Sequence, residues 1–261
     1  MTGPPPLLEA RALDARRGPR PVLHQVTLSL QAGEAAALVG PNAAGKSTLL
    51  RVLAGLLPPE GGQVLLLGRP LGSWERDARA RTVALVAQDE DAPPLLTVEE
   101  RARLGRFPHR GPFRALDEAD HAAVERALER TGTRALRARR LSTLSAGERQ
   151  LAALARGLAQ EPRVLLLDEP GAHLDVGHQL QLFRVLDEVR AEGVAVLAVV
   201  HDLQRAAEWA GRMLLLVEGR IAAQGDPRAV LTGETCGRAF GVAVRAHAPA
   251  DGPTLYSFTS S

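Results

Sequence analysis

The chain has almost no lysine and few aromatic residues. Of its 32 lysine and arginine residues only Lys46 is lysine, so 32 − 1 = 31 are arginine. Aromatic residues make up 3% of the 261 positions, whereas 45% are hydrophobic. A chain of this length can bury a sizeable core, which must therefore be built from leucine, valine and alanine. Lys46 stands out as a position that arginine, used everywhere else, does not fill.

Cysteine and long apolar runs are equally scarce. Cys236 is alone, which excludes an intrachain disulfide and favours a reducing compartment. The longest apolar stretch, Gly193–Val200, is far shorter than the roughly 18–20 residues of a membrane span. The beginning, MTGPPPLLEA, lacks the basic and then apolar pattern of a signal peptide. A net charge of +2, with acids among the arginines, does not indicate nucleic-acid binding. We expect a protein that is soluble or peripheral to a membrane, with no nucleic-acid partner.

Short apolar runs alternate with helical patterns, which is typical of an α/β fold with a largely parallel sheet. Strands are expected at Val26–Leu30, Ala35–Val39, Val64–Leu67, Val83–Ala87, Val164–Asp168, Ala195–Val200 and Met213–Val217. Helices are expected to begin near Lys46, Val98, Ala119, Ala146, Gly177 and Leu203. Between about residues 89 and 160 the pattern is helical, so an insertion splits the core, and Thr97 with Glu100 predicts the cap of its first helix. The last stretch, HAPADGPTLYSFTSS, is polar and expected to be loose.

Residues 40–48, GPNAAGKST, follow an apolar run and fit the P-loop pattern G-x-x-x-x-G-K-[ST]. Backbone N–H groups of such a loop surround phosphate oxygens, and the helix that follows favours an anion at its N-terminus. Lys46 is predicted to bridge the β- and γ-phosphates, since arginine's planar fork does not fit the wrapped loop. A glycine-rich turn at a helix start is the structural alternative. The predicted nucleotide-binding residues are Gly40, Pro41, Asn42, Ala43, Ala44, Gly45, Lys46, Ser47 and Thr48.

A second motif, VLLLDEP at residues 164–170, runs from an apolar strand into two carboxylates. Ligands of open α/β sheets bind at such strand ends. Asp168 is predicted to hold Mg²⁺ through water, together with the Ser47 hydroxyl, and Glu169 to act as general base on the attacking water. Many buried strands end in an acidic residue, so this motif alone is weak evidence for a nucleotide site. Together with the P-loop about 120 residues earlier it is strong evidence. The guanine motif N-K-x-D needs a second lysine, so the pair predicts ATP with Mg²⁺.

The segment LSAGERQ, residues 144–150, identifies the class. Ser145 and Glu148 form a capping-box pattern on a helix from about Ala146 to Leu158, which alone would explain them. The segment also lies about 18 residues before Asp168 and resembles the LSGGQ signature of ABC ATPases. The resemblance covers roughly residues 7 to 240. It implies an α/β P-loop NTPase (RecA-like) core with an inserted α-helical subdomain and an N-terminal antiparallel β subdomain.

The family resemblance also implies a domain plan and a homodimer. Residues 1–245 are expected to form one nucleotide-binding domain, with a core of about 1–88 and 161–245, a helical subdomain of about 89–160 and a tail of 246–261. Two copies are expected to sandwich two ATP molecules, with Ser145, Gly147 and Asp175 of one copy contacting the ATP of the other. Gln88, which ends VALVAQ, resembles the residue that senses Mg²⁺ and the attacking water, and His201 in VVHDL resembles the switch histidine. Without the other motifs, Gln88 would be a polar strand end and His201 a structural histidine.

The chain departs from the family pattern at three places, and it has one histidine pair that belongs to no family motif. No aromatic residue precedes Trp74 to stack on adenine, so Arg16 or Arg17 is predicted to stack its guanidinium plane instead. Ala146 replaces a signature glycine with little expected harm. Ala43 replaces a loop glycine, so its φ is either negative or strained in a way that ATP relieves. His173 and His178 lie five apart, not at the i,i+4 spacing of a metal site, and no metal is expected there.

The absence of spans and the single nucleotide-binding unit imply docking on two separate integral-membrane permease subunits at the cytoplasmic face of the inner membrane. A substrate-binding protein would be an indirect partner. TVEERARLGRFPHRGPF, residues 97–113, resembles the ATPases of iron-chelate, haem and cobalamin importers. Ferric siderophore is the first cargo predicted, haem the second and cobalamin the third. The alternatives are a soluble ABC ATPase of DNA repair or ribosomes, against which the length argues, and a non-hydrolysing regulator, against which Glu169, Gln88 and His201 argue.

Overall fold

A six-stranded sheet forms the centre of the computed structural model, which describes residues 4–87, 93–110, 114–172, 174–247 and 254–260. Across the sheet the strands are β10 (Arg220–Gly225), β9 (Arg212–Val217), β3 (Ala35–Val39), β8 (Ala195–Val199), β7 (Val164–Leu167) and β6 (Val83–Val86). All neighbours are parallel except β10, which runs antiparallel to β9. β3, β7 and β8 are buried on both faces, which is why they read as continuous apolar runs in the sequence.

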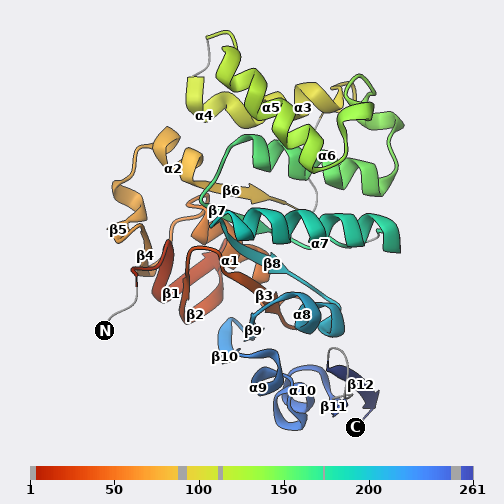
Figure 1. The fold of residues 1–261 in the computed structure, drawn as a ribbon. Coiled ribbons are helices and arrows are strands. Elements are labelled where there is room, and N and C mark those ends of the chain that lie inside the picture. The colour runs from red at the N-terminus through yellow and green to blue at the C-terminus, as the bar shows by residue number, and fades with distance from the viewer. Residues whose placement is uncertain (1–3, 88–92, 111–113, 173, 248–253, 261) are drawn as a thin grey trace.

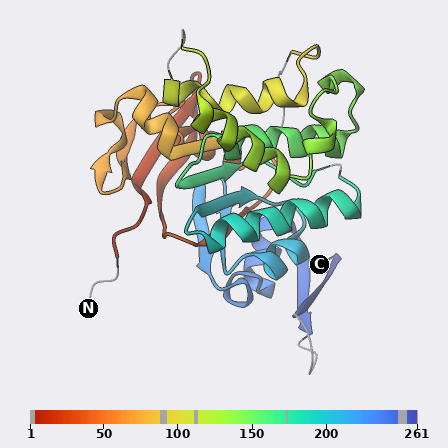
Figure 2. The ribbon, with the colours of Figure 1, turned by 45° about the horizontal axis from the view of Figure 1, so that its top comes forward.

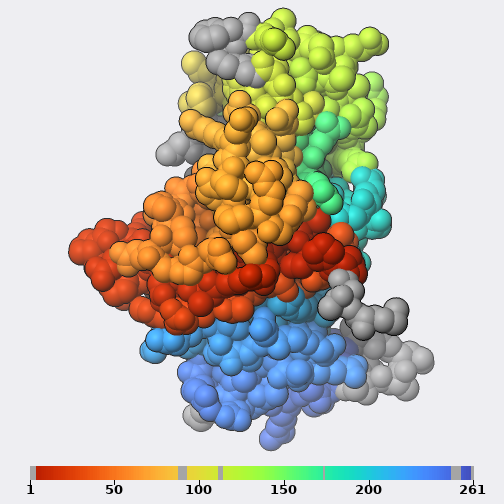
Figure 3. All heavy atoms as spheres, turned by 90° about the vertical axis from the view of Figure 1, so that its left-hand side faces the viewer, coloured from red at the N-terminus to blue at the C-terminus, as the bar shows by residue number. Residues whose placement is uncertain are grey.

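A second, antiparallel sheet covers one side of the first (Figure 1). Its strands, in order, are β2 (Arg20–Leu30), β1 (Leu8–Arg17), β4 (Gly61–Leu66) and β5 (Arg69–Pro70). Buried side chains of both sheets and of α1 (Lys46–Leu53) form one apolar cluster between them. Figure 3 shows the N-terminal segments as a red and orange band between the helical region and the C-terminal segments. The predicted N-terminal antiparallel β subdomain is therefore confirmed.

Helices dominate the predicted insertion, which rises above the central sheet in Figures 1 and 2. Its helices are α3 (Val98–Arg103), α4 (Phe107–Arg110), α5 (Glu118–Arg130) and α6 (Ala146–Ala159). Short 3₁₀ turns lie between α3 and α4 and between α5 and α6. Thr97 caps α3 in the predicted box with Glu100. Outside the insertion lie α2 (Arg76–Thr82), α7 (Val176–Ala191) and α8 (Leu203–Trp209). In the described ranges, no helix combines the length and the apolar character needed to cross a membrane.

A buried arginine of the LGRFPH stretch ties together α5 and the end of α6. Arg106 is 4% exposed, and its Nε lies 2.8 Å from Oδ1 of Asp120 on α5. The same guanidinium donates to the carbonyl of Ala159, the last residue of α6, and to Glu161, which follows the helix. His109 contacts the Gln160 carbonyl at 2.9 Å. Because a buried charge needs partners, these contacts explain two residues of the stretch by packing within the chain.

The C-terminal segment differs from the prediction of a loose tail. After α9 (Pro227–Val230) and α10 (Gly233–Phe240), the strands β11 (Val242–His247) and β12 (Leu255–Ser260) pair antiparallel. Tyr256 is buried, and its backbone N–H donates to the side-chain carbonyl of Gln204 on α8 at 2.7 Å. The prediction of looseness is wrong for this strand, because one aromatic anchor and a paired partner strand order a polar segment. The domain boundaries stay predictions.

Candidate functional site

The predicted site residues meet at one edge of the central sheet because its strands are parallel. The loop after β3 is the P-loop, Asp168 and Glu169 follow β7, and His201 follows β8. These three strands are neighbours in the order β3, β8, β7. The carboxyl ends of parallel strands lie at the same edge, so residues more than a hundred positions apart come together there. The predicted residue Gln88 follows β6 but lies outside the described residues.

The P-loop is held by its own lysine and by the neighbouring strands. Lys46 is buried, and its Nζ donates to the carbonyls of Gly40 at 2.8 Å and Pro41 at 2.9 Å. Burial lowers the pKa of Lys46, while Glu169 and then Asp168 act in the opposite direction. Gly40 has φ +151°, and a Cβ there would lie 2.0 Å from the Leu216 carbonyl oxygen, so only glycine fits. A compact ammonium inside a closed loop suits the geometry of a phosphate cradle.

Ala43 adopts the left-handed conformation, which answers the question that the sequence left open. Its φ is +62°, a region that costs an L-residue with a Cβ about 1–2 kcal/mol. The adjoining Ala44 is buried, and its carbonyl accepts from Gly219 N–H at 3.0 Å. The loop therefore carries backbone strain at an exposed position next to a well-anchored one. Whether ATP relieves the strain stays a hypothesis.

Replacing Ala43 with glycine is expected to raise the free energy of unfolding by about 0.5–1 kcal/mol, since the relieved strain exceeds the added backbone entropy of the unfolded chain. Denaturant unfolding of the nucleotide-free protein measures it. The matched control is Ala44→Gly, which removes a buried methyl group where φ is not positive and is expected to destabilise the protein. If Ala43→Gly lost as much stability as Ala44→Gly, the backbone at Ala43 would not be strained.

Asp168 has the properties of a ligand for a divalent cation. It is 8% exposed, and its Oδ1 has no hydrogen-bond partner within the described part of the chain. Burial raises the pKa of Asp168, against which a hydrogen bond from Ser47 acts. A buried carboxylate oxygen beside a hydroxyl suits Mg²⁺, which takes few protein oxygens and completes its shell with water and phosphate. Ser47 and Asp168 therefore fit the ion predicted for them.

We expect Asp168→Asn to raise the stability of the metal-free protein, because the variant removes a charge whose burial is unfavourable. Binding of Mg-ATP should then stabilise the variant far less than the parent chain, for which ligand at a hundredfold excess over Kd contributes about 2.7 kcal/mol. Thermal unfolding with and without Mg-ATP measures both effects. An unchanged stabilisation by Mg-ATP would rule out Asp168 as a ligand.

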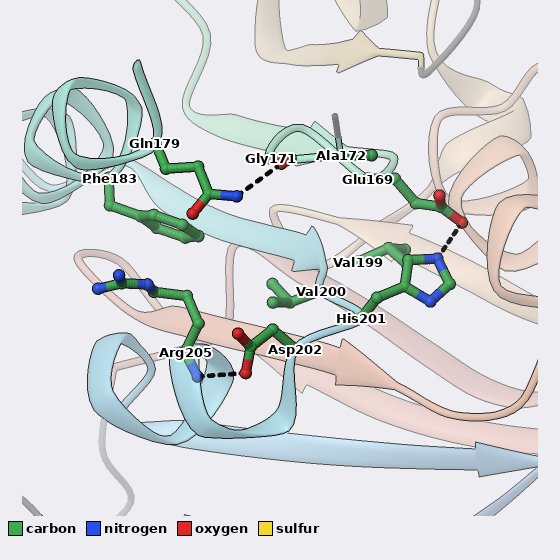
Figure 4. A pocket seen from close by; sticks show the side chains of 10 residues that line it. All are labelled: Glu169, Gly171, Ala172, Gln179, Phe183, Val199, Val200, His201, Asp202 and Arg205. Atoms are coloured by element: carbon green, nitrogen blue, oxygen red, sulfur yellow. Dashed lines mark hydrogen bonds and ion pairs between the residues drawn. The ribbon is translucent and has the colours of Figure 1, made fainter. Parts of the chain in front are cut away.

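Glu169 and His201 form a pair at the sheet edge (Figure 4). Nε2 of His201 lies 2.5 Å from Oε1 of Glu169, and the two side chains are 43% and 18% exposed. Glu169 has φ +51°, a strained conformation for a residue with a side chain, of a kind that concentrates at functional sites. The pair borders a cavity of about 230 Å³ whose wall includes Phe183 and Val200. A carboxylate that is held by a histidine and reachable from solvent can accept a proton from water.

The turn that follows Glu169 is tied to α7 by a residue that sequence reasoning missed. Gln179 donates from Nε2 to the Gly171 carbonyl at 3.1 Å, one of the bonds drawn in Figure 4. A glutamine inside a helix carries no signal for this contact, because the turn meets the helix only in three dimensions. The bond constrains the chain two residues after Glu169.

The signature segment caps α6 as predicted. Ser145 is the N-cap, and the Glu148 backbone N–H donates to its Oγ at 3.2 Å. The Ser145 hydrogen bond to Glu148 lowers the pKa of that carboxyl. Ser145 and Ala146 are exposed at the helix start, and Asp175, which caps α7, is exposed as well. These residues present hydrogen-bonding groups and a helix N-terminus to solvent, which suits an anion brought by another molecule.

Arg16 and Arg17 lie at the end of β1, next to the turn into β2. Arg16 pairs with Glu60 at 2.8 Å, and both side chains are about half exposed. Val22, farther along β2, approaches the P-loop so closely that a Cβ on Gly45 would lie 3.0 Å from its Cγ1. The hairpin therefore flanks the loop, and adenine stacking by Arg16 or Arg17 stays a prediction.

Among the described residues there is no group of three or more histidine, cysteine, aspartate and glutamate side chains that could hold a metal ion. His173 lies outside the described residues. His178 points to Asp175 instead, with Nδ1 2.7 Å from Oδ2.

Comparisons with known proteins agree with these motifs. The family model described as ABC transporter matches residues 23–172. The hemin import ATP-binding protein HmuV of Myxococcus xanthus is 44% identical over 91% of this chain and 91% of its own length. The ferric enterobactin transport ATP-binding protein FepC of Escherichia coli is 38% identical over 90% of this chain and 87% of its own.

Other relatives differ in length or only share the fold. The cobalamin import ATP-binding protein BtuD of Halobacterium salinarum is 41% identical over 89% of this chain, which spans 58% of that relative's length. A solved ABC transporter in an inward-facing conformation matches 98% of this chain and 97% of its own, with a TM-score of 0.84 and 24% identity. The last similarity bears on the fold alone, and it includes the C-terminal segment.

Proposed function

Because this chain belongs to the ABC transporter family, we propose that it is the ATP-hydrolysing subunit of an importer, which takes up a ferric-siderophore type of iron chelate through separate permease subunits. The subunit works as a homodimer on two permease subunits at the cytoplasmic face of the inner membrane. A substrate-binding protein delivers the cargo to the permease. The apolar side chains Leu95 and Phe107, 69% and 43% exposed, support the helical region as the proposed docking side.

The observation that carries the proposal is the Glu169–His201 pair beside a P-loop on one sheet edge. Glu169 accepts a proton from the attacking water. In the nucleotide-free chain His201 holds Glu169 through Nε2, and the same N–H turns to the γ-phosphate when ATP is bound. Lys46 leaves its two loop carbonyls for the β- and γ-phosphates. Ser47, Asp168 and the predicted Gln88 would hold Mg²⁺, which would neutralise phosphate charge when bound.

The other half of each site comes from a second copy of the chain. Ser145 is exposed at the α6 N-terminus, and Gly147 lies buried in the first turn behind it. In the dimer these residues complete the γ-phosphate site of the partner. Asp175 lies at the same face of the dimer. ATP closes the dimer, hydrolysis opens it, and the helical region transmits the movement to the permease.

The cargo has two leading candidates. The LGRFPH stretch supports all three cargoes equally. Ferric siderophore is supported by the relative named for ferric enterobactin transport, at 38% identity. Hemin is the second candidate, supported by relatives named for hemin import at 44% and 45% identity. The cobalamin-import relative, at 41%, keeps cobalamin as the third.

One experiment tests the role and separates the cargoes. The subunit is isolated from membranes with its bound proteins, and the complex is reconstituted in vesicles. ATP hydrolysis is then measured with the substrate-binding protein loaded with ferric siderophore, hemin or cobalamin. We expect a co-purifying permease and the largest stimulation by ferric siderophore. Stimulation by hemin alone would change the cargo, whereas co-purification of nucleic acid without a permease would overturn the importer role.

A further inference from the structure

His178, which the predicted reaction does not use, lies against the signature segment. A Cβ built on Gly147 would lie 2.5 Å from Cγ of His178 and 2.7 Å from its Nδ1. Such distances are impossible for real atoms, so the imidazole ring occupies the space that any side chain at position 147 would need. Gly147 is buried under this ring, in the first turn of α6. The signature glycine thus has a structural reason within its own chain.

The same histidine is bound to Asp175 in two ways. The His178 backbone N–H donates to Oδ1 of Asp175 at 2.9 Å, and its ring Nδ1 lies 2.7 Å from Oδ2. Since a carboxylate only accepts, Nδ1 carries the hydrogen, which defines the tautomer of the neutral ring. The hydrogen bonds from His178 lower the pKa of Asp175. The carboxylate therefore stays charged and caps α7 while it orients the ring.

The two contacts join segments of different origin. The α6 N-terminus belongs to the helical region, whereas Asp175 and α7 follow the core strand β7. His178 packs on the first and hydrogen-bonds to the second. Ser145, Gly147 and Asp175 are the residues that the proposed function assigns to the partner's ATP. One side chain thus sets their relative position before any partner arrives.

We propose that His178 is a positioning residue, which holds the signature turn and the Asp175 turn in one arrangement so that both reach the ATP of the partner subunit together. The inference rests on the proposed function, because it concerns the half-site offered to a second copy. Pre-organising the two turns removes an ordering cost from dimer closure and adds nothing to ATP binding by the P-loop of the same chain. The effect is therefore specific to dimerisation.

The first test compares dimerisation in the Glu169→Gln background, in which hydrolysis is stopped. Sizing by light scattering across a Mg-ATP titration gives the concentration at which half of the protein is dimeric. Glu169→Gln/His178→Ala should need at least about fivefold more Mg-ATP to reach half dimer, since coupling between two sites is usually about fivefold or larger. Nucleotide affinity of the monomer, measured with a fluorescent ATP analogue, should stay within twofold. Glu169→Gln/His121→Ala is the control, since His121 is an exposed histidine on α5.

His178→Phe separates packing from hydrogen bonding, because it retains a ring over Gly147 but cannot donate to Asp175. It should fall between the parent and His178→Ala in the Mg-ATP that it needs. If Glu169→Gln alone forms no dimer, the homodimer of the proposed function fails, and the positioning role fails with it. If Glu169→Gln dimerises and Glu169→Gln/His178→Ala dimerises at the same Mg-ATP concentration, only the positioning role is overturned.

The second test uses melting temperature, and so stands apart from dimerisation. Gly147→Ala should lower the melting temperature of the parent chain, since the new methyl group collides with the ring of His178. In the His178→Ala background, the same substitution should raise it, because the collision is gone and alanine favours a helix. An equal decrease in both backgrounds would show that the ring does not pack on Gly147.

Discussion

Replacing Glu169 with glutamine is expected to slow ATP hydrolysis by about 10²–10⁴-fold, the usual contribution of a general base. The amide keeps the size of the carboxylate and cannot accept a proton from water. It also leaves His201 with a neutral partner in place of the carboxylate at 2.5 Å. ATP binding should survive, since Lys46 and the P-loop are unchanged. The variant should therefore accumulate as a dimer with trapped ATP.

The measurement combines steady-state phosphate release with sizing in Mg-ATP. Glu234→Gln serves as the matched control, because Glu234 lies on α10 with its side chain 76% exposed and should change neither readout. A Glu169→Gln protein that stays monomeric and turns over ATP at the parent rate would contradict two predictions: that Glu169 is the general base and that ATP-bound chains dimerise. Slow turnover with no dimer would retain Glu169 as the base and remove the trapped state.

Lys46→Arg is expected to weaken ATP binding by about 10²–10³-fold, as though the charge were absent. The ammonium makes two close bonds within the loop, and a hydrogen bond to a charged group contributes about 1.5–3 kcal/mol. Lys46 is 6% exposed, so the larger planar guanidinium has no room to take its place. The charge is kept and the shape is changed, which makes the substitution a test of geometry.

Isothermal calorimetry with a non-hydrolysable ATP analogue measures this loss. Arg238→Lys is the matched exchange in the other direction, at a side chain 78% exposed, and should leave affinity unchanged. Melting curves verify that Lys46→Arg remains folded. If Lys46→Arg retained its affinity for ATP, the geometry of the loop would not explain why position 46 is lysine and not arginine.

Much of the central sheet could be predicted because its strands are buried on both faces and read as apolar runs. Ala35–Val39 matches β3 residue for residue, and α3, α6 and α8 begin at the predicted positions. β1 was missed, since its alternation is broken by shifts in register between Ala10 and Leu13, with Ala12 at φ +48°. A bulge of this kind changes which face each residue takes, so period-two reasoning fails there.

The tail was misjudged for a related reason. Polar composition in LYSFTS suggested looseness, yet β12 is ordered by pairing with β11, by burial of Tyr256 and by the amide of Gln204. These contacts form only in the folded chain, so the composition of the segment does not predict them. Local sequence carries no record of them.

The sequence by itself determined the family, the phosphate loop and the acids that follow β7, because these motifs depend on residue type at fixed short spacing. Only the tertiary structure decided that Ala43 takes a positive φ and that His178 fills the space over Gly147. It also decided that Oδ1 of Asp168 is buried with no hydrogen-bond partner among the residues that the structure describes. Backbone conformation, burial and packing depend on segments distant in the chain. The loop GPNAAGKST could be recognised from its letters, but its strain and its lysine contacts exist only when β3, β9 and β2 surround it.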